Sequence, residues 1–186
     1  MQKRKVFTTF DIVLMALLAV ANAVLTVYIA FLNKTLTAIG GPIATSVTVG
    51  IYILYGLLAI YIIRKPGTAF ITFMLGATVQ TLFGISYGMV AAYGAALCYA
   101  IAMEGVYALY RYRNWGYLPV IWASLGATII WFPLAAYLFG YLKWGTPILL
   151  TSLLIRCLSG VLLCGLLAKW IGDGLVKTGL LRFYTA

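Results

Sequence analysis

The chain has 186 residues, of which 65% are hydrophobic and only 9% are charged. A water-soluble domain carries about 25% charged residues, so the composition predicts an integral membrane protein and excludes a soluble globule. Histidine is absent and the only acidic residues are Asp11, Glu104 and Asp173, which excludes bis-histidine haem, HExxH zinc sites and histidine-based catalytic triads. We therefore expect no metal site, no cofactor and no catalytic residue.

Six apolar stretches follow one another and predict an all-α fold, a six-transmembrane-helix bundle that forms a single membrane domain over residues 1–186. The first stretch follows a basic start and is too long for the apolar core of a cleaved signal peptide, so we expect it to remain as a helix. A loop is expected at residues 33–45, which contain two glycines and a proline. The predicted helices cover about residues 7–31, 46–63, 68–83, 89–110, 118–140 and 147–171.

The net charge of +10 follows the pattern of a membrane protein and does not indicate a nucleic-acid partner, because no basic patch alternates with exposed aromatic residues. On one side of the predicted bundle, the three loops that join the helices contain two cations, Lys34 and Lys143. An excess of Lys and Arg marks cytoplasmic segments, so both termini are predicted to be cytoplasmic. The cations of that side are Lys3, Arg4, Lys5, Arg64, Lys65, Arg111, Arg113, Lys169, Lys177 and Arg182.

Two charged residues lie inside predicted helices. A cation at the depth of Arg156 costs about 2.5–3.5 kcal/mol on insertion scales, so Arg156 requires a partner or a function. Counting 1.5 Å per residue places Glu104 at a similar depth, which allows an ion pair that joins the fourth and sixth helices as a structural element beneath a pocket. The alternative is that one or both residues contact a polar ligand.

Aromatic and amide side chains gather in the half of the bundle that is predicted to be extracellular. Flat aromatic walls with a few amides suit a planar, hydrogen-bonding heterocycle. Tyr and Trp also gather at membrane interfaces whatever the function, and Gln80 could equally form an interhelical hydrogen bond. We assign Tyr87, Tyr141 and Trp144 to the interface. The candidate substrate-binding residues are Gln80, Glu104, Asn22, Tyr52, Tyr93, Trp131 and Tyr28.

Ala16, Ala19 and Ala23 place small side chains on one face of the first predicted helix. Such a face allows another helix to pack closely, either from this chain or from a partner.

Several segments carry a family resemblance: residues 41–44 (GPIA), 63–67 (IRKPG), Glu104, 155–160 (IRCLSG) and 162–169 (LLCGLLAK), followed by Asp173 and the Thr-Gly pair at 178–179. With them the chain resembles the S components of energy-coupling factor (ECF) vitamin transporters, and more narrowly the YkoE-type thiamine or hydroxymethylpyrimidine family. The resemblance implies capture of a vitamin from outside a prokaryotic plasma membrane. It also implies a transmembrane coupling protein that contacts Ala16, Ala19 and Ala23, and two cytoplasmic ATPases. A carboxylate is expected near position 80 in that family, whereas this chain has Gln80.

Two other functions are compatible with the residues. A self-contained secondary transporter or a channel would also be a small apolar bundle. An intramembrane enzyme would need paired acids, histidine or a nucleophile at matched depth, and these are lacking. No nucleotide-binding motif is present, so ATP hydrolysis is expected from separate subunits.

Overall fold

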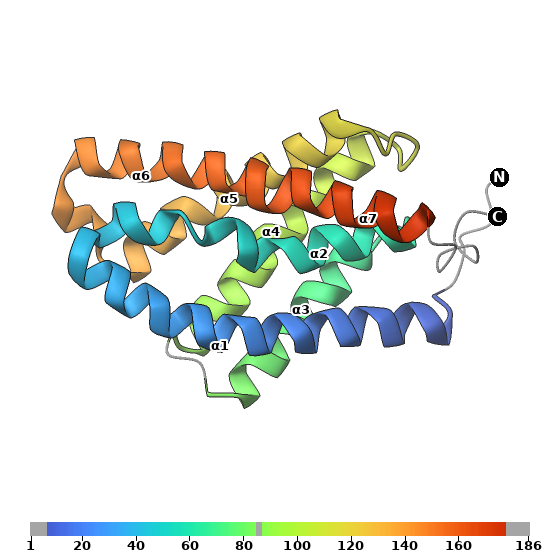
Figure 1. Ribbon diagram of the computed structural model, residues 1–186, viewed down its shortest axis with the longest axis horizontal. Coiled ribbons are helices and arrows are strands. Elements are labelled where there is room, and N and C mark those ends of the chain that lie inside the picture. The colour runs from blue at the N-terminus through green and yellow to red at the C-terminus, as the bar shows by residue number, and fades with distance from the viewer. Residues whose placement is uncertain (1–6, 85–86, 178–186) are drawn as a thin grey trace.

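A computed structural model describes residues 7–84 and 87–177, and all regular secondary structure in these ranges is helical (Figure 1). α6, η2 and α7 continue into one another, because the residues that join them keep helical backbone angles. The elements are α1 (Thr9–Ser46), α2 (Val49–Ile63), α3 (Thr68–Leu82), α4 (Met89–Leu109), α5 (Tyr117–Leu138), the 3-10 turn η1 (Tyr141–Trp144), α6 (Thr146–Ser159), the π-helical segment η2 (Gly160–Leu166) and α7 (Leu167–Lys177).

The predicted all-helical architecture is confirmed, and its helix bounds agree with the predicted stretches except in the first helix and at a few termini. By length and hydropathy, the segments able to cross a membrane are α1, α4, α5 and the continuous Thr146–Leu175. α2 and α3 are apolar but have 15 residues each, about 22 Å of helix against a hydrocarbon core of about 30 Å. That all six predicted helices cross the membrane therefore stays a prediction.

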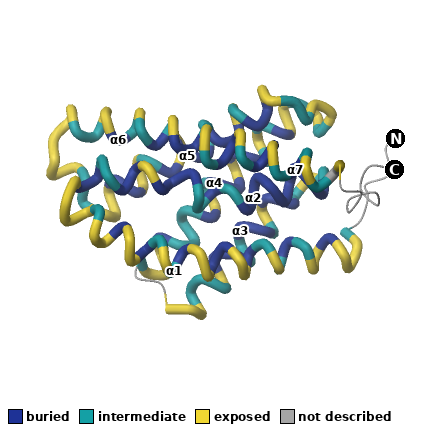
Figure 2. The backbone as a smooth tube through the Cα atoms, in the orientation of Figure 1, coloured by how far each residue is buried: buried dark blue, intermediate teal, exposed yellow. Residues whose placement is uncertain are grey.

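α2 is the central helix of the bundle, and twelve of its 15 residues are buried. Figure 2 shows this helix as a mostly dark tube between α1 and the continuous α6–α7 helix. A helix enclosed by other helices has little contact with lipid. Its apolar side chains therefore pack against protein, and its length need not match the thickness of the membrane.

The predicted loop at residues 33–45 is wrong. The first helix continues through these residues to a kink at Gly41, whose backbone angles (φ 57°, ψ −144°) leave the helical region. Glycine adopts a positive φ without steric cost, and Pro42 has no N–H to donate, so both residues suit a kinked helix as well as a loop. The Trp144 ring lies 3.1 Å from where a Cβ of Gly41 would be. The kink turns the chain back toward α2.

Two acidic residues are held by lysines at the end of the bundle where α1 begins and α7 ends (Figure 1). Asp11 is fully buried and pairs with Lys65 of the α2–α3 turn. Asp173 lies 3.0 Å from Lys169 and accepts a hydrogen bond from the Tyr61 hydroxyl. These pairs connect α1 and α7 to the turns and helices of the cation-rich end.

The small residues of the sixth predicted helix face inward, as expected from their spacing. Ser152, Gly160, Cys164 and Ala168 are buried together with Arg156. α5 packs directly on this stripe, since a Cβ on Gly160 would lie 2.6 Å from the Thr128 hydroxyl oxygen. Close approach of the helix backbones therefore depends on these small side chains.

Replacement of Gly50 by Ala should destabilise the bundle. The Gly50 amide donates to Ser159 Oγ at 3.1 Å, and an added Cβ would lie 2.3 Å from the Ser159 carbonyl oxygen. Overpacking of this kind costs about 1–3 kcal/mol, so the detergent-purified variant should melt several degrees below wild type. Gly105→Ala is the matched control, because no atom lies within 4 Å of its added Cβ and Ala is favoured over Gly inside a helix. Equal melting temperatures for the two variants would contradict the contact.

Candidate functional site

A cavity lies at the end of the bundle opposite to the Asp11–Lys65 pair. Its lining comes from the six α-helices α1 to α6, together with the turn before α4 and the segment between α5 and α6. The volume is about 110 Å³, several times the roughly 10–15 Å³ that one water requires. Most of the aromatic and polar side chains that line the cavity are those of Tyr52, Tyr55, Phe73, Tyr87, Tyr99, Trp131, Phe139 and Tyr141, with Asn33, Gln80 and Arg156.

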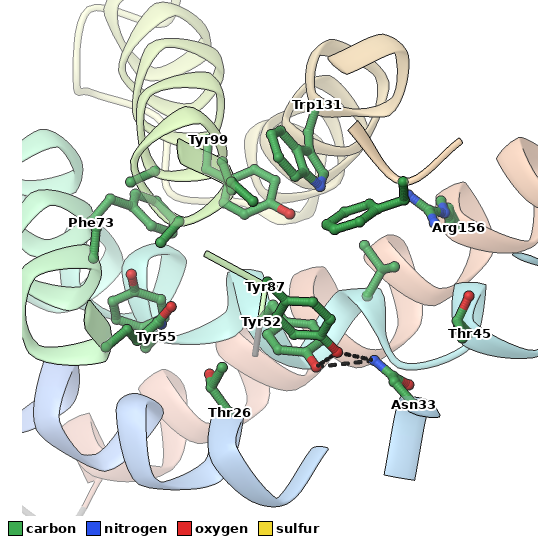
Figure 3. A pocket seen from close by; sticks show the side chains of 18 of the residues that line it. Thr26, Asn33, Thr45, Tyr52, Tyr55, Phe73, Tyr87, Tyr99, Trp131 and Arg156 are labelled. Carbon is green, nitrogen blue, oxygen red and sulfur yellow. Dashed lines mark hydrogen bonds between the residues drawn. The ribbon is translucent and has the colours of Figure 1, made fainter. Parts of the chain in front are cut away.

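One wall of the cavity is a row of aromatic rings from four helices, α2 to α5 (Figure 3). Tyr55 contacts Phe73 edge-on at 5.0 Å between ring centroids, Phe73 contacts Tyr99 at 5.5 Å, and Tyr99 contacts Trp131 at 6.0 Å. Edge-to-face contacts of this kind are favourable and orient the rings. The row therefore offers a planar ligand ring faces that are already positioned.

Asn33 organises the opposite wall through hydrogen bonds to three side chains. Its Nδ2 donates to the hydroxyls of Tyr52 (3.0 Å) and Tyr87 (3.2 Å), as Figure 3 shows. Its Oδ1 accepts from Thr48 Oγ1 at 2.9 Å. The amide thus joins α1 to the start of α2 and to the turn before α4. The sequence prediction missed Asn33 because it placed this residue in a loop.

Arg156 lies in the cavity wall and is only 4% exposed. Its Nε donates to Ser46 Oγ at 3.1 Å, and its guanidinium lies 5.3 Å from the Phe132 ring centroid and 5.1 Å from that of Tyr141. The ion pair with Glu104 that was expected from depth is wrong. Among the described residues, the ion pairs within 4.0 Å are Lys65–Asp11 and Lys169–Asp173.

Glu104 lies outside the cavity lining and closes the N-terminus of α3. Its carboxylate accepts from the backbone amides of Gly67 (3.0 Å) and Ala69 (2.8 Å), and from the Tyr112 hydroxyl. Burial, and then the hydrogen bond to Glu104, raise the pKa of Tyr112 further above its ordinary value, so its hydroxyl stays a donor to Glu104 into the alkaline range. Free amides at a helix N-terminus attract a carboxylate, so Glu104 has a structural role in this position.

The other candidate residues divide between the cavity and its surroundings. Gln80, Tyr52 and Trp131 line the cavity. So do Tyr87 and Tyr141, which the sequence reading assigned to the membrane interface.

Besides Glu104, three candidates lie outside the lining. Asn22 is buried and donates to Thr26 Oγ1 at 3.4 Å, Tyr93 bonds to Thr78 at 3.1 Å, and Tyr28 is 71% exposed. Depth along a helix was predictable from the sequence, whereas the direction of each side chain around the helix axis was not.

The alanine face of α1 is largely internal. Ala19 and Ala23 are fully buried against this chain's own helices, whereas Ala16 is partly exposed. Ala19 and Ala23 therefore do not provide an open surface for a partner. Their small side chains pack α1 against the rest of the bundle, and α3 makes the most extensive contact with it.

Comparison with known proteins shows the family of the chain. A family described as the permease component of an ABC-type cobalt transport system matches residues 10–130. A crystal structure of an S component of an ECF transporter superimposes with a TM-score of 0.89 and 28% sequence identity, covering 97% of this chain and 91% of the other. The putative HMP/thiamine permease protein YkoE of Bacillus subtilis (strain 168) is 31% identical over 173 residues, which are 92% of this chain and 86% of YkoE. The chain belongs to the YkoE-type family of ECF-transporter S components.

This membership confirms the predicted family and makes this S component a substrate-binding part of a transporter. Its relatives are transporter components and not enzymes. In this S component, the described residues contain no group of three His, Cys, Asp or Glu side chains that could hold a metal ion. The aromatic cavity is therefore its candidate substrate site.

Replacement of Glu104 by Gln should lower stability without changing the cavity. The amide group of Gln cannot accept at both positions that now bond to Gly67 and Ala69. Hydrogen bonds to a charged group contribute about 1.5–3 kcal/mol, so the melting temperature should fall by several degrees and the first turn of α3 should exchange amide hydrogens faster. Tyr93→Phe, which removes one exposed bond to Thr78, is the control and should melt within a degree or two of wild type. A Glu104→Gln variant as stable as wild type would refute the capping role.

Proposed function

We propose that this S component captures thiamine or its hydroxymethylpyrimidine precursor from outside the cell. The observation that carries the proposal is the aromatic cavity with Gln80 in its wall. The HMP/thiamine name of the YkoE relative supports the same substrate class. Both compounds contain an aminopyrimidine ring, which is planar and has donors and acceptors along its edge.

The cavity matches an aminopyrimidine in two respects. The rings of Phe73, Tyr99 and Trp131 provide faces for stacking. The Gln80 side chain makes no hydrogen bond to any described residue, so its donor and acceptor are available to a ligand. A primary amide can donate to a ring nitrogen and accept from an exocyclic amine at the same time.

The proposed orientation follows from charge. The cation-rich turns lie at one end of the bundle and the cavity lies at the other, so the positive-inside pattern directs the cavity to the outside. The proposal includes six membrane crossings in a prokaryotic plasma membrane, with both termini cytoplasmic. Substrate release inside would depend on a transmembrane coupling protein and two cytoplasmic ATPases. The surface that meets the coupling protein would use residues of α1 other than the buried Ala19 and Ala23.

Isothermal titration of the detergent-purified protein tests the ligand. We expect saturable binding of hydroxymethylpyrimidine or thiamine, and a loss of about tenfold in affinity for Gln80→Ala, because one or two hydrogen bonds of about 1 kcal/mol each are removed. Tyr137→Ala is the control, since Tyr137 is 73% exposed and outside the lining. Absence of binding by both compounds to folded protein would refute the substrate assignment.

Uptake measurements test the need for partners. Liposomes that contain this S component alone should not accumulate labelled pyrimidine, whereas liposomes that also contain an ECF coupling protein, its ATPases and internal ATP should do so. Accumulation by the S component alone would favour a self-contained secondary transporter or a channel. Bound ligand measured on the same liposomes separates failure of transport from failure of binding.

A further inference from the structure

The cavity contains a cation and no carboxylate side chain. The whole sequence has three acidic residues, so the positions of all of them are known. Asp11 pairs with Lys65, Asp173 with Lys169, and Glu104 accepts from the α3 amides and Tyr112. None of the three acids lines the cavity. No side chain of this protein can therefore neutralise Arg156 or attract a cationic ligand by charge.

The terminal nitrogens of Arg156 are available for hydrogen bonds. Among the described residues, its one hydrogen bond runs from Nε to Ser46, and its guanidinium also makes cation–π contacts with the rings of Phe132 and Tyr141. A guanidinium presents five N–H donors in a planar arrangement that matches anionic and carbonyl-type acceptors. A buried charge without an ionic partner is costly, and in a membrane protein it marks a ligand contact.

We propose that the site selects a planar heterocycle that has no fixed positive charge and that presents an anionic or strongly accepting group to Arg156. This inference rests on the proposed function and makes its substrate specific: the neutral pyrimidine fits, whereas the permanently cationic thiazolium of thiamine is disfavoured. Two features of the cavity act in the same direction. Arg156 repels a second cation, and Gln80 supplies an amide where a carboxylate would have attracted one.

A pair of isosteric ligands isolates the charge. In 3-deazathiamine a carbon atom replaces the charged nitrogen of the thiazolium ring, so shape is kept and the charge is removed. Thiamine and 3-deazathiamine are titrated into the protein, and so is hydroxymethylpyrimidine at a pH above the pKa of its ring. The protein should bind the two neutral compounds at least about tenfold more tightly than thiamine, a difference of about 1.4 kcal/mol in binding free energy. Thiamine binding as tightly as 3-deazathiamine, or more tightly, would overturn the proposal.

Two single substitutions should move the preference toward thiamine. Arg156→Gln removes the repelling cation, and Gln80→Glu introduces an attracting carboxylate of nearly the same shape. Each variant should raise the ratio of thiamine to 3-deazathiamine affinity by about tenfold, while Tyr137→Ala leaves the ratio unchanged. Ligand-free Arg156→Met should melt no lower than wild type if the charge has no ionic partner. An unchanged ratio in both Arg156→Gln and Gln80→Glu would overturn the role of charge.

A second ligand series separates this inference from the pyrimidine assignment. Nicotinate, nicotinamide and 1-methylnicotinamide are similar flat rings that are anionic, neutral and cationic. Quenching of tryptophan fluorescence at high concentrations of these probes should follow that order of affinity in wild type, with the order lost in Arg156→Gln. If no pyrimidine binds but this order holds, the proposed substrate fails and the charge selectivity stands. If 1-methylnicotinamide equals or exceeds nicotinate, or if neither binds, the charge selectivity fails.

Discussion

The arrangement of this bundle depends on where three carboxylates meet their partners. With only Asp11, Glu104 and Asp173 available, each one is bound at the cation-rich end of the molecule. Lys65 and Lys169 are held beside two of these carboxylates and are mostly buried, although lysines at the ends of apolar helices usually extend to the membrane interface. These contacts hold the helix ends together at one side. The opposite side, where the cavity forms, has no acidic side chain and is held by neutral hydrogen bonds, aromatic contacts and the bond from Arg156 to Ser46.

The cavity end has its own bracing, built mostly from uncharged groups. Asn33 bonds to Tyr52, Tyr87 and Thr48, and its position depends on the extension of α1 toward Gly41. A network of amides, phenols and hydroxyls is well suited to a low-dielectric site, because these groups satisfy one another's hydrogen bonds without the desolvation cost of an ion pair. The wall is therefore ordered before any ligand is bound.

Hydropathy was sufficient to predict the helical stretches, but not the details that form the site. The bounds of α3 and α4 lie within one residue of their prediction, since long apolar runs end at clear turn signals. The first helix was predicted too short, because Gly41 and Pro42 suit a loop and a kink equally. That error concealed Asn33. Arg156 was correctly assigned to the bundle interior from its small neighbours, and the cavity residues Gln80, Tyr52 and Trp131 were found from their depth.

The incorrect pairing of Glu104 with Arg156 has a specific physical cause. Residue counting gives the position of a side chain along the membrane normal, whereas contact also requires the two side chains to point toward each other. Glu104 is directed to the amides at the start of α3, where three donors meet it, and such a site competes well against one distant cation. The alanines of α1 left the packing partner open for a related reason, and Ala19 and Ala23 pack within this chain. Small residues indicate close packing but do not identify which helix packs there.

Arg156 can be both a structural and a ligand-binding residue, because the two roles use different parts of its side chain. Insertion of such a cation costs about 2.5–3.5 kcal/mol, and a cation–π contact returns about 0.5–1 kcal/mol when exposed and about 2 kcal/mol when desolvated. The rings of Phe132 and Tyr141, with the Ser46 hydroxyl, therefore offset most of the cost in the empty cavity. The hydrogen bond to Ser46 uses Nε, and the ring contacts use the charge of the guanidinium and not its terminal N–H donors. The terminal N–H groups lie at its edge, so an acceptor that enters the cavity adds to these interactions without displacing them.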